Sequence, residues 1–178
     1  NLPMWMVFEI GPDATDTTMW RGWNGVQGVL THALNARVCF GGTAAGLYVI
    51  NFRSDESTLH YVNNDNSGTR KYIGLRNQYL PYTTRDGTNP ISAQRIHSID
   101  MKVVPNAKVD VHGIPIPSIA VGLETAGASI IDSTGVVYNL TNVYTVTGIK
   151  FTEDNRIWTA SQVGNNTEGM YLNPYPTA

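Results

Sequence analysis

Residues 36–51 read Ala36-Arg-Val-Cys-Phe-Gly-Gly-Thr-Ala-Ala-Gly-Leu-Tyr-Val-Ile-Asn51, and most of this pattern returns, without a gap, at Ser118 to Asp132. Val38-Cys-Phe-Gly41, for example, corresponds to Ile119-Ala-Val-Gly122. The offset between the copies is constant at 81 residues, the difference between positions 119 and 38. Each copy has an apolar run, a Gly-rich turn, a second apolar run and a closing Asn or Asp. This pattern predicts a buried β-hairpin.

A third copy, which needs small gaps, lies near the end of the sequence. There Arg156–Ala160 is similar to Arg37–Gly41, and Gly169–Asn173 is similar to Gly46–Asn51. A hairpin alone is only marginally stable in water, so repeated hairpins are expected to stack around a shared core, as in solenoids and propellers.

We therefore predict an all-β fold of repeated antiparallel hairpins or four-stranded blades, with a propeller-like arrangement. Because the copies align without a gap, Gly46 and Gly127 are expected to occupy equivalent turns. The second unit is expected to have four strands, and the periodicity places them at Ile99–Val104, Ile119–Leu123, Ala128–Asp132 and Val136–Leu140.

The organisation that follows is a single β-repeat domain over residues 1–178. Its units lie at about 26–65, 96–141 and 144–178, with an irregular insertion at 69–94. Residues 2–10 read as the last strand of a further unit, and the sequence opens on Asn1, so we expect a fragment or a processed product. Closed propellers have about four to eight blades, so three units are not expected to close one.

The composition favours turn-rich β structure over helices. Charged residues make up 15% of the chain, against about 25% in an average domain, and the net charge is −2. This charge gives no reason to expect nucleic acid as a partner. No apolar run approaches the roughly 18 residues of a membrane span. The one cysteine, Cys39, lies in an apolar run and is expected to be a buried small hydrophobe.

Four segments resemble large repeat-bearing proteins of bacteriophages and aquatic metagenomes that are described as tail-fibre or propeller-like. The segments are Leu2-Pro-Met-Trp-Met-Val-Phe8, Gly46-Leu-Tyr-Val-Ile-Asn-Phe52, Val103-Val-Pro-Asn-Ala107 and Pro115-Ile-Pro-Ser-Ile-Ala-Val121. The resemblance covers about two thirds of the chain and implies an architecture and a setting, namely a virion or an extracellular appendage. Residues 53–95 depart from the pattern, and any specific ligand contact is expected there.

Motifs of catalysis are missing from the sequence, which has no nucleophile elbow, phosphate loop or dinucleotide fingerprint. We therefore expect a protein that is not an enzyme and needs no cofactor. A glycan-degrading activity of tailspike type stays open, because glycosidase carboxylates can come from distant strands.

No metal site is predicted either. Asn63-Asn-Asp-Asn-Ser-Gly68 begins like a calcium loop, but its twelfth position is Gly74 instead of the required Glu. Asn139 and Asn165 stand in glycosylation acceptor patterns, which matter only for a eukaryotic source or a glycosylated filament.

Two aromatic segments are the candidate ligand-binding residues. Aromatic faces beside Arg and Asp suit a saccharide, which stacks its C–H face on a ring and hydrogen-bonds through its hydroxyls. The irregular insertion has no repeat counterpart, and loops on a rigid scaffold often hold recognition residues. The alternative is that these rings cover the ends of the sheets. The first candidates are Tyr79, Tyr82, Arg85 and Asp86, and the second are Trp20 and Trp23.

The function that the sequence favours is a structural and adhesion module of a phage virion or surface appendage, which binds a host glycan or protein receptor. Its expected partners are other copies of itself or neighbouring appendage proteins, together with a carbohydrate or cell-surface receptor. The alternative is a purely structural subunit of an extracellular fibre or filament, in which the hairpins pack against the next subunit. Aromatic loops on an open face favour binding, and aromatic loops buried between subunits favour the filament.

Overall fold

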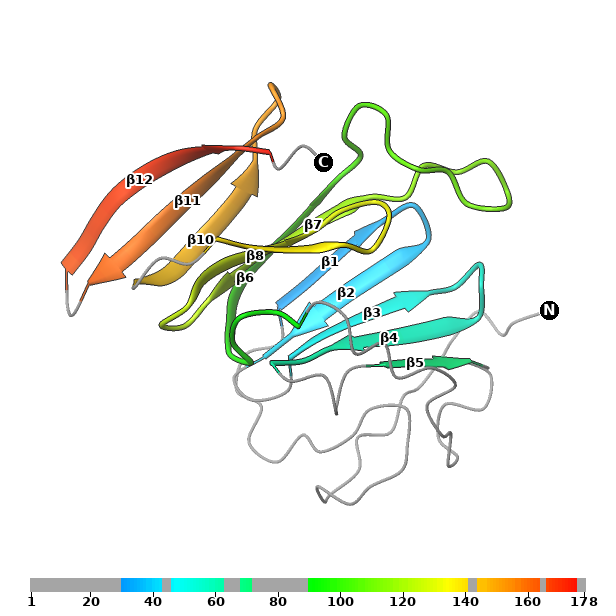
Figure 1. Cartoon of the computed structure of the whole chain (residues 1–178), viewed down its shortest axis with the longest axis horizontal. Coiled ribbons are helices and arrows are strands. Elements are labelled where there is room, and N and C mark those ends of the chain that lie inside the picture. The colour runs from blue at the N-terminus through cyan, green and yellow to red at the C-terminus, as the bar shows by residue number, and fades with distance from the viewer. Residues whose placement is uncertain are drawn as a thin grey trace, which may run out of the picture.

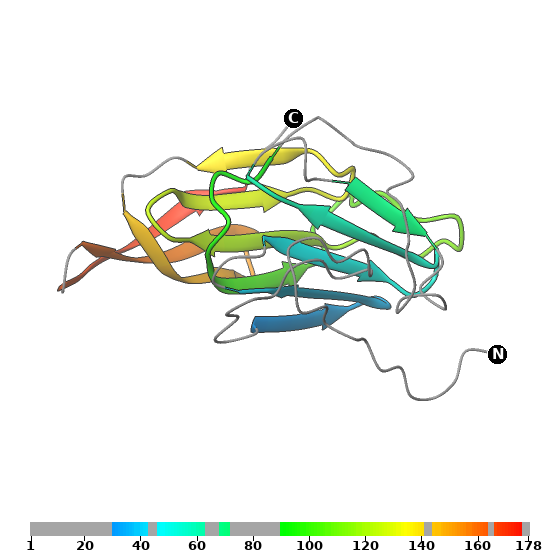
Figure 2. The ribbon, with the colours of Figure 1, turned by 90° about the horizontal axis from the view of Figure 1, so that it is seen from below.

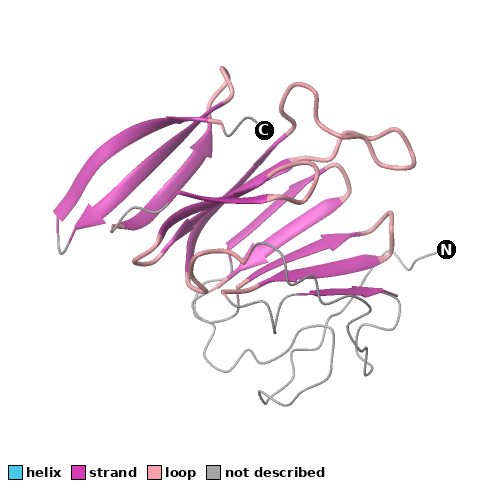
Figure 3. Ribbon diagram, in the orientation of Figure 1, coloured by secondary structure: helices cyan, strands magenta, loops and turns pink. Residues whose placement is uncertain are grey.

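The structure, a computed structural model, describes residues 30–42, 46–62, 68–71, 90–140, 144–163 and 166–175. Strands and no helices are present in these residues, as Figure 3 shows. This confirms the all-β prediction. The strands are β1 (Leu30–Leu34), β2 (Arg37–Gly41), β3 (Leu47–Asn51), β4 (Glu56–His60), β5 (Gly68–Lys71), β6 (Ile96–Lys102), β7 (Ser118–Leu123), β8 (Gly127–Ile131), β9 (Val137–Leu140), β10 (Thr145–Phe151), β11 (Arg156–Val163) and β12 (Asn166–Pro174).

The strands form three consecutive antiparallel units (Figure 1). The first unit is β1 to β4 in sequence order, with β5 added on β4, and the second is β6 to β9. The third unit is β10 to β12, and a single parallel pair between Thr145 and Gly127 joins it to the second as one larger mixed sheet. The four strands predicted for the second unit are thus present, within a few residues at their ends.

The two gapless copies form hairpins with the same register. In the first, Val38 pairs with Ile50 and Gly41 pairs with Leu47. In the second, Ile119 pairs with Ile131 and Gly122 pairs with Ala128, so each pair is shifted by the same 81 residues. Gly46 and Gly127 both have positive φ, at 72° and 79°, a conformation that glycine adopts without strain. The two glycines therefore occupy equivalent positions where the turn meets the second strand, as predicted, and residues 43–45 of the first turn lie outside the described part of the chain.

The third copy is also a hairpin with the predicted partners. Trp158 pairs with Leu172 and Ala160 with Met170, as Cys39 pairs with Val49 and Gly41 with Leu47. Its strands continue past these pairs through a β-bulge, so the turn lies further along the chain than in the other two copies. The predicted match of Asn173 with Asn51 is wrong by one residue, because Asn173 pairs with Ile157 as Ile50 pairs with Val38.

The second unit lies between the other two and is buried on both faces (Figures 1 and 2). Every residue of β7 and β8 is buried, which matches their nearly continuous runs of apolar and small residues. One face packs on the first unit around Cys39, Leu47, Ile91, Ile96, Met101, Ile119, Val121, Leu123 and Ile131. The other packs on the third unit around Ala120, Ala128, Ile130, Val146, Ile149, Phe151 and Ile157.

The contact between one unit and the next is made twice in the same way. The Gly46 amide donates a hydrogen bond of 3.1 Å to the Gln94 carbonyl, which lies just before β6. The Gly127 amide donates one of 3.2 Å to the Tyr144 carbonyl, just before β10. We call the face that meets the next unit the forward face. It holds Cys39 and Gly41 in the first unit and Ala120 and Gly122 in the second. In the third unit we give the same name to the face with Trp158 and Ala160, which stand at the equivalent positions of the hairpin.

Asp100 on β6 links all three units. Its carboxylate lies 3.1 Å from Nδ1 of His32 on β1, and its other oxygen accepts a 2.7 Å hydrogen bond from the Phe151 amide on β10. One side chain of the middle unit thus contacts both neighbours, which fixes their separation from it.

Two details of the sequence interpretation need correction. Residues 69–71 are not part of an irregular insertion, because they belong to β5 and pair with β4. A propeller is also not formed by the described strands, since neither sheet closes. The predicted strand at residues 2–10 and the calcium-like turn at residues 63–67 lie outside the described part of the chain.

Candidate functional site: a cleft between the first two units

The residues that the sequence singled out for ligand binding cannot be placed. Tyr79, Tyr82, Arg85 and Asp86, like Trp20 and Trp23, lie outside the described residues. They therefore stay predictions, and the described part of the chain offers a different site.

This site is an open cleft of about 320 Å³ between the first and second units. It lies where the forward face of β2–β4 meets the ends of β7 and β8 and two loops of the second unit. A volume of this size is at the lower end of the range for small-molecule sites. The cleft is lined by Arg37, Val49, Asn51, Glu56, Thr58, His60, Lys108, Ile116, Pro117, Ile119, Ile131, Asp132, Ser133, Thr134 and Gly135.

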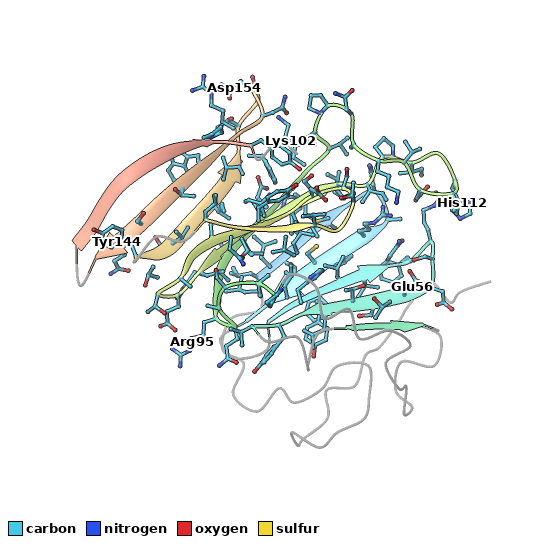
Figure 4. The ribbon with its side chains drawn as sticks, viewed as in Figure 1. Glu56, Arg95, Lys102, His112, Tyr144 and Asp154 are labelled. Carbon is cyan, nitrogen blue, oxygen red and sulfur yellow. The ribbon has the colours of Figure 1, made fainter. Side chains whose placement is uncertain are left out.

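The first wall is set by the alternation of side chains along β4. Ser57 and Leu59 are buried on the opposite face of the sheet, at 3% and 6% exposure. Because successive side chains of a strand point to opposite faces, Glu56, Thr58 and His60 line the cleft together. Figure 4 shows Glu56 at the end of β4 that lies nearest the second unit's long loop.

The second wall comes from that loop, residues 105–117 between β6 and β7, which we call the arm. Asp110 organises its tip, because Oδ1 accepts hydrogen bonds from the amides of His112 (2.9 Å) and Ile114 (3.0 Å). Both hydrogen bonds lower the pKa of the Asp110 carboxyl, and the bond from the Ile114 amide has the larger effect. The Asn35 side-chain amide fastens the arm to the first unit by donating 2.8 Å to the Pro115 carbonyl.

Charged side chains hold the arm against the first unit. Arg37 is 6% exposed, and its guanidinium lies 3.7 Å from Oδ2 of Asp110, which Arg53 approaches to 3.9 Å. Burial lowers the pKa of Arg37 and the Asp110 charge raises it, but an arginine stays protonated in proteins. Asp110 Oδ2 is buried and has no hydrogen-bond partner among the described residues. This pairing is thus electrostatic, and it leaves hydrogen-bonding capacity unused.

The turn at Asp132 closes the cleft from the second unit. Asp132 Oδ1 accepts hydrogen bonds from the amides of Thr134 (2.8 Å) and Val136 (3.0 Å), the same pattern as at Asp110. Burial alone would raise the pKa of Asp132, but these bonds, with one from the Thr134 hydroxyl, lower it overall. Asn51, its counterpart in the first copy, accepts 3.1 Å from the Arg53 amide. The closing Asn51 and Asp132 of the two gapless copies therefore each shape a turn at the cleft.

Two further groups near the cleft are neutral at neutral pH. Burial lowers the pKa of His60 to about 4, so its imidazole is uncharged. Burial also raises the pKa of the Cys39 thiol, and the side chain is fully buried. Cys39 is thus the buried small hydrophobe that the sequence predicted, and not a reactive nucleophile.

The described residues also bear on a metal site, a membrane-spanning helix and a glycosylation acceptor. No group of three or more His, Cys, Asp or Glu side chains there is arranged to hold a metal ion. The same residues include no helix with the length and apolar character needed to cross a membrane. The amide of Asn139, one of the two glycosylation acceptors, donates to the Pro90 carbonyl at 3.1 Å and accepts from Ser129 at 2.6 Å. Asn139 therefore has a structural role in fixing the chain that enters the second unit.

Comparison with known proteins gives no family or function for the chain. No protein-family model, curated protein or solved structure matches it.

A local signal for the cleft was present in the sequence. The pattern Asp-x-x-Gly occurs at Asp110–Gly113 and at Asp132–Gly135, and both glycines have positive φ. Each pattern forms the same Asp-organised turn, in which the Asp side chain accepts backbone hydrogen bonds. The Asp132 turn lines the cleft, and the Asp110 turn shapes the tip of the arm whose other residues line it. No sequence pattern indicates that Lys108 of the arm and Glu56 of β4 line one cleft, since these residues are 52 positions apart.

Proposed function

We propose that this chain is a structural and adhesion module of a phage virion or surface appendage, and that it is not an enzyme. The observation that favours this role is the inter-unit contact made twice, with Gly46 and Gly127 donating equivalent hydrogen bonds. Units that pack by one repeated contact build a rigid scaffold of extendable length. The virion or extracellular setting rests on the resemblance of the sequence segments to tail-fibre and propeller-like proteins.

Receptor binding is the second part of this proposal. Rigid repeat scaffolds present loops, and the polar cleft between the first two units is held by two Asp-organised turns. Tyr79, Tyr82, Arg85 and Asp86 are the sequence candidates for a larger contact surface.

Replacing Tyr79 and Tyr82 together by Ala tests receptor binding. We expect the binding of the intact appendage to host cells or to a glycan array to fall about tenfold or more, because each stacked ring contributes about 0.5–1.5 kcal/mol beyond its burial. The unfolding temperature should stay unchanged. The measurements are a cell-adsorption assay, array fluorescence and a thermal melt.

The matched control is Tyr144→Ala, an exposed tyrosine that precedes β10. Loss of folding in the double variant, or unchanged adsorption, contradicts the proposed role and assigns these rings to structure.

The second candidate function, a purely structural fibre or filament subunit, is favoured by the forward face of the third unit. In the first two units this face is covered by the next unit. In the third, Trp158 and Ala160 stand at the equivalent positions with exposed Thr147 and Lys150 beside them, and no described strand covers them. A head-to-tail contact of this kind builds a closed ring or an open fibre, and a propeller-like ring is one such closure.

Trp158→Arg tests this candidate. If a further unit packs on this face, the chain should self-associate in a concentration-dependent way. The added charge should then raise the dissociation constant of self-association at least tenfold. Sedimentation velocity over a range of concentrations measures the shift, with Val111→Arg at the exposed arm tip as the control. A wild-type chain that is monomeric at every concentration removes this candidate.

A further inference from the structure

We propose that the cleft between the first two units binds one neutral saccharide unit of a glycan. This inference deepens the proposed adhesion function, on which it rests for its setting. The volume of about 320 Å³ accommodates one or two sugar rings, and the open mouth lets the rest of a glycan chain extend into solvent.

The lining suits hydroxyl groups, which both donate and accept hydrogen bonds. Donors come from Arg37, Lys108 and the side-chain N–H groups of the half-buried Asn51, whose Oδ1 already accepts from two backbone amides. Glu56 and Asp132 supply acceptors. The two positive and two negative formal charges cancel, and His60 adds none because it is neutral. A ligand with many hydroxyls and no net charge is the chemical class that this set accommodates best.

The floor suits the apolar face of a sugar ring. Val49 comes from the first unit, Ile119 and Ile131 come from the second, and Ile116 and Pro117 end the arm. Ile119 and Ile131 pair across β7 and β8, so they form one continuous apolar surface. A pyranose ring packs its C–H groups on such a surface while its hydroxyls reach the polar walls.

The guanidinium of Arg37 lines the cleft and can donate hydrogen bonds to a ligand. Its contacts with described residues are a 3.4 Å hydrogen bond to the Asn35 carbonyl and the 3.7 Å ion pair with Asp110. Most of its five N–H donors are therefore free to bind another group. No Arg37 nitrogen is both fully buried and without a partner among the described residues, so a ligand hydroxyl that accepts from Arg37 takes the place of solvent in the open cleft.

Free anions fit the cleft less well. A phosphate or carboxylate gains from Arg37 and Lys108, but it meets Glu56 and Asp132 in the same cleft. Like charges that are held close together in a partly desolvated site repel. The wall residues thus favour a neutral sugar over an acidic one.

Saturation-transfer NMR on the folded 178-residue chain tests this site. The probes are the methyl glycosides of glucose, galactose, mannose and N-acetylglucosamine, with glucuronate and inorganic phosphate as anionic comparators. We expect at least one neutral glycoside to bind, and Lys108→Ala and Glu56→Gln each to weaken it about tenfold, since each removes a charged hydrogen-bonding group. The matched controls are Lys150→Ala and Glu153→Gln, which change exposed residues of the third unit and should leave binding unchanged.

Each other outcome overturns the proposal. Stronger binding of glucuronate or phosphate than of any neutral glycoside means that the cleft is an anion site. Neutral-sugar binding that Lys108→Ala and Glu56→Gln leave intact means that the sugar binds elsewhere. No binding of any probe by the folded chain excludes the site, whereas host-cell adsorption by the intact appendage still tests the adhesion function separately.

Discussion

Gly122→Ala should lower the free energy of unfolding by about 3 kcal/mol, near the upper end of the usual cost of overpacking a core. A Cβ atom at this position lies 2.7 Å from the Val146 carbonyl oxygen and 2.9 Å from its Cγ1 atom. The carbonyl belongs to the backbone of β10 and cannot rotate away, so the second and third units must separate. For a chain of this size the unfolding temperature should drop by about 6–12 °C, as measured by a thermal melt.

Two other glycines provide matched controls. At Gly41, the equivalent position of the first unit, the added atom meets the terminal Cδ1 of Ile96 at 2.5 Å, a methyl group that can turn aside, and the Cβ of Ile96 at 3.1 Å, which needs a shift of a few tenths of an ångström. At Gly148 the nearest atoms lie at 3.3 and 3.4 Å. We expect the destabilisation to rank Gly122→Ala above Gly41→Ala, with Gly148→Ala last. A Gly122→Ala variant as stable as Gly148→Ala would show that the units do not pack as closely as described.

Ile130→Ala is expected to cost about 3 kcal/mol, within the range of about 2–5 for truncating a buried isoleucine to alanine. Ile130 is fully buried and packs between the second and third units with Val146, Ile149 and Phe151. The strands on both sides hold it in place, so the site cannot collapse to fill the cavity. Urea unfolding measures the loss as a lower midpoint with an unchanged slope.

The control for this prediction is Val111→Ala. Val111 is 94% exposed at the arm tip, so the same kind of truncation should change stability by less than about 0.5 kcal/mol. Equal midpoints for the two variants contradict a shared core between the second and third units. A changed urea slope in Ile130→Ala alone indicates that the third unit unfolds separately from the others.

The small residues of the middle unit explain why the second and third units pack so closely. On β7 and β8, Ala120, Gly122 and Ala128 occupy the forward face, where the third unit lies. In the third unit the position of Gly122 is taken by Ala160, and no described strand packs on that face. This position is thus a glycine where the next unit packs closely and an alanine where no described strand packs.

The arm shows how the cleft depends on contacts between units. Lys108, Ile116 and Pro117 reach the cleft because Asn35, Arg37 and Arg53 hold the arm against the first unit. The backbone amide of Lys108 also donates 2.9 Å to the Ser133 hydroxyl of the Asp132 turn. The arm is therefore fastened both to the first unit and to the Asp132 turn by residues that are distant in the sequence.

The sequence by itself determined the hairpins, because hairpin formation is local. Two apolar runs, a glycine at the turn and a closing Asn51 or Asp132 specify a strand pair and its register over about 15 residues, and the gapless repeat showed the same pattern twice. The buried state of Cys39 followed in the same way from its apolar neighbours. The strand at residues 68–71 was missed because its pairing with β4 comes from a partner strand and not from its own short polar sequence.

Only the tertiary structure decided which faces meet and where a ligand can enter. The layering of the three units depends on close approach at Gly41 and Gly122, which a linear pattern does not distinguish from an ordinary turn glycine. The cleft combines Arg37, Glu56, Lys108 and Asp132, residues from four separate segments whose spacing in the sequence contains no periodic signal. Packing between units is non-directional and depends on shape, so it assembles the site from residues that local propensity cannot relate.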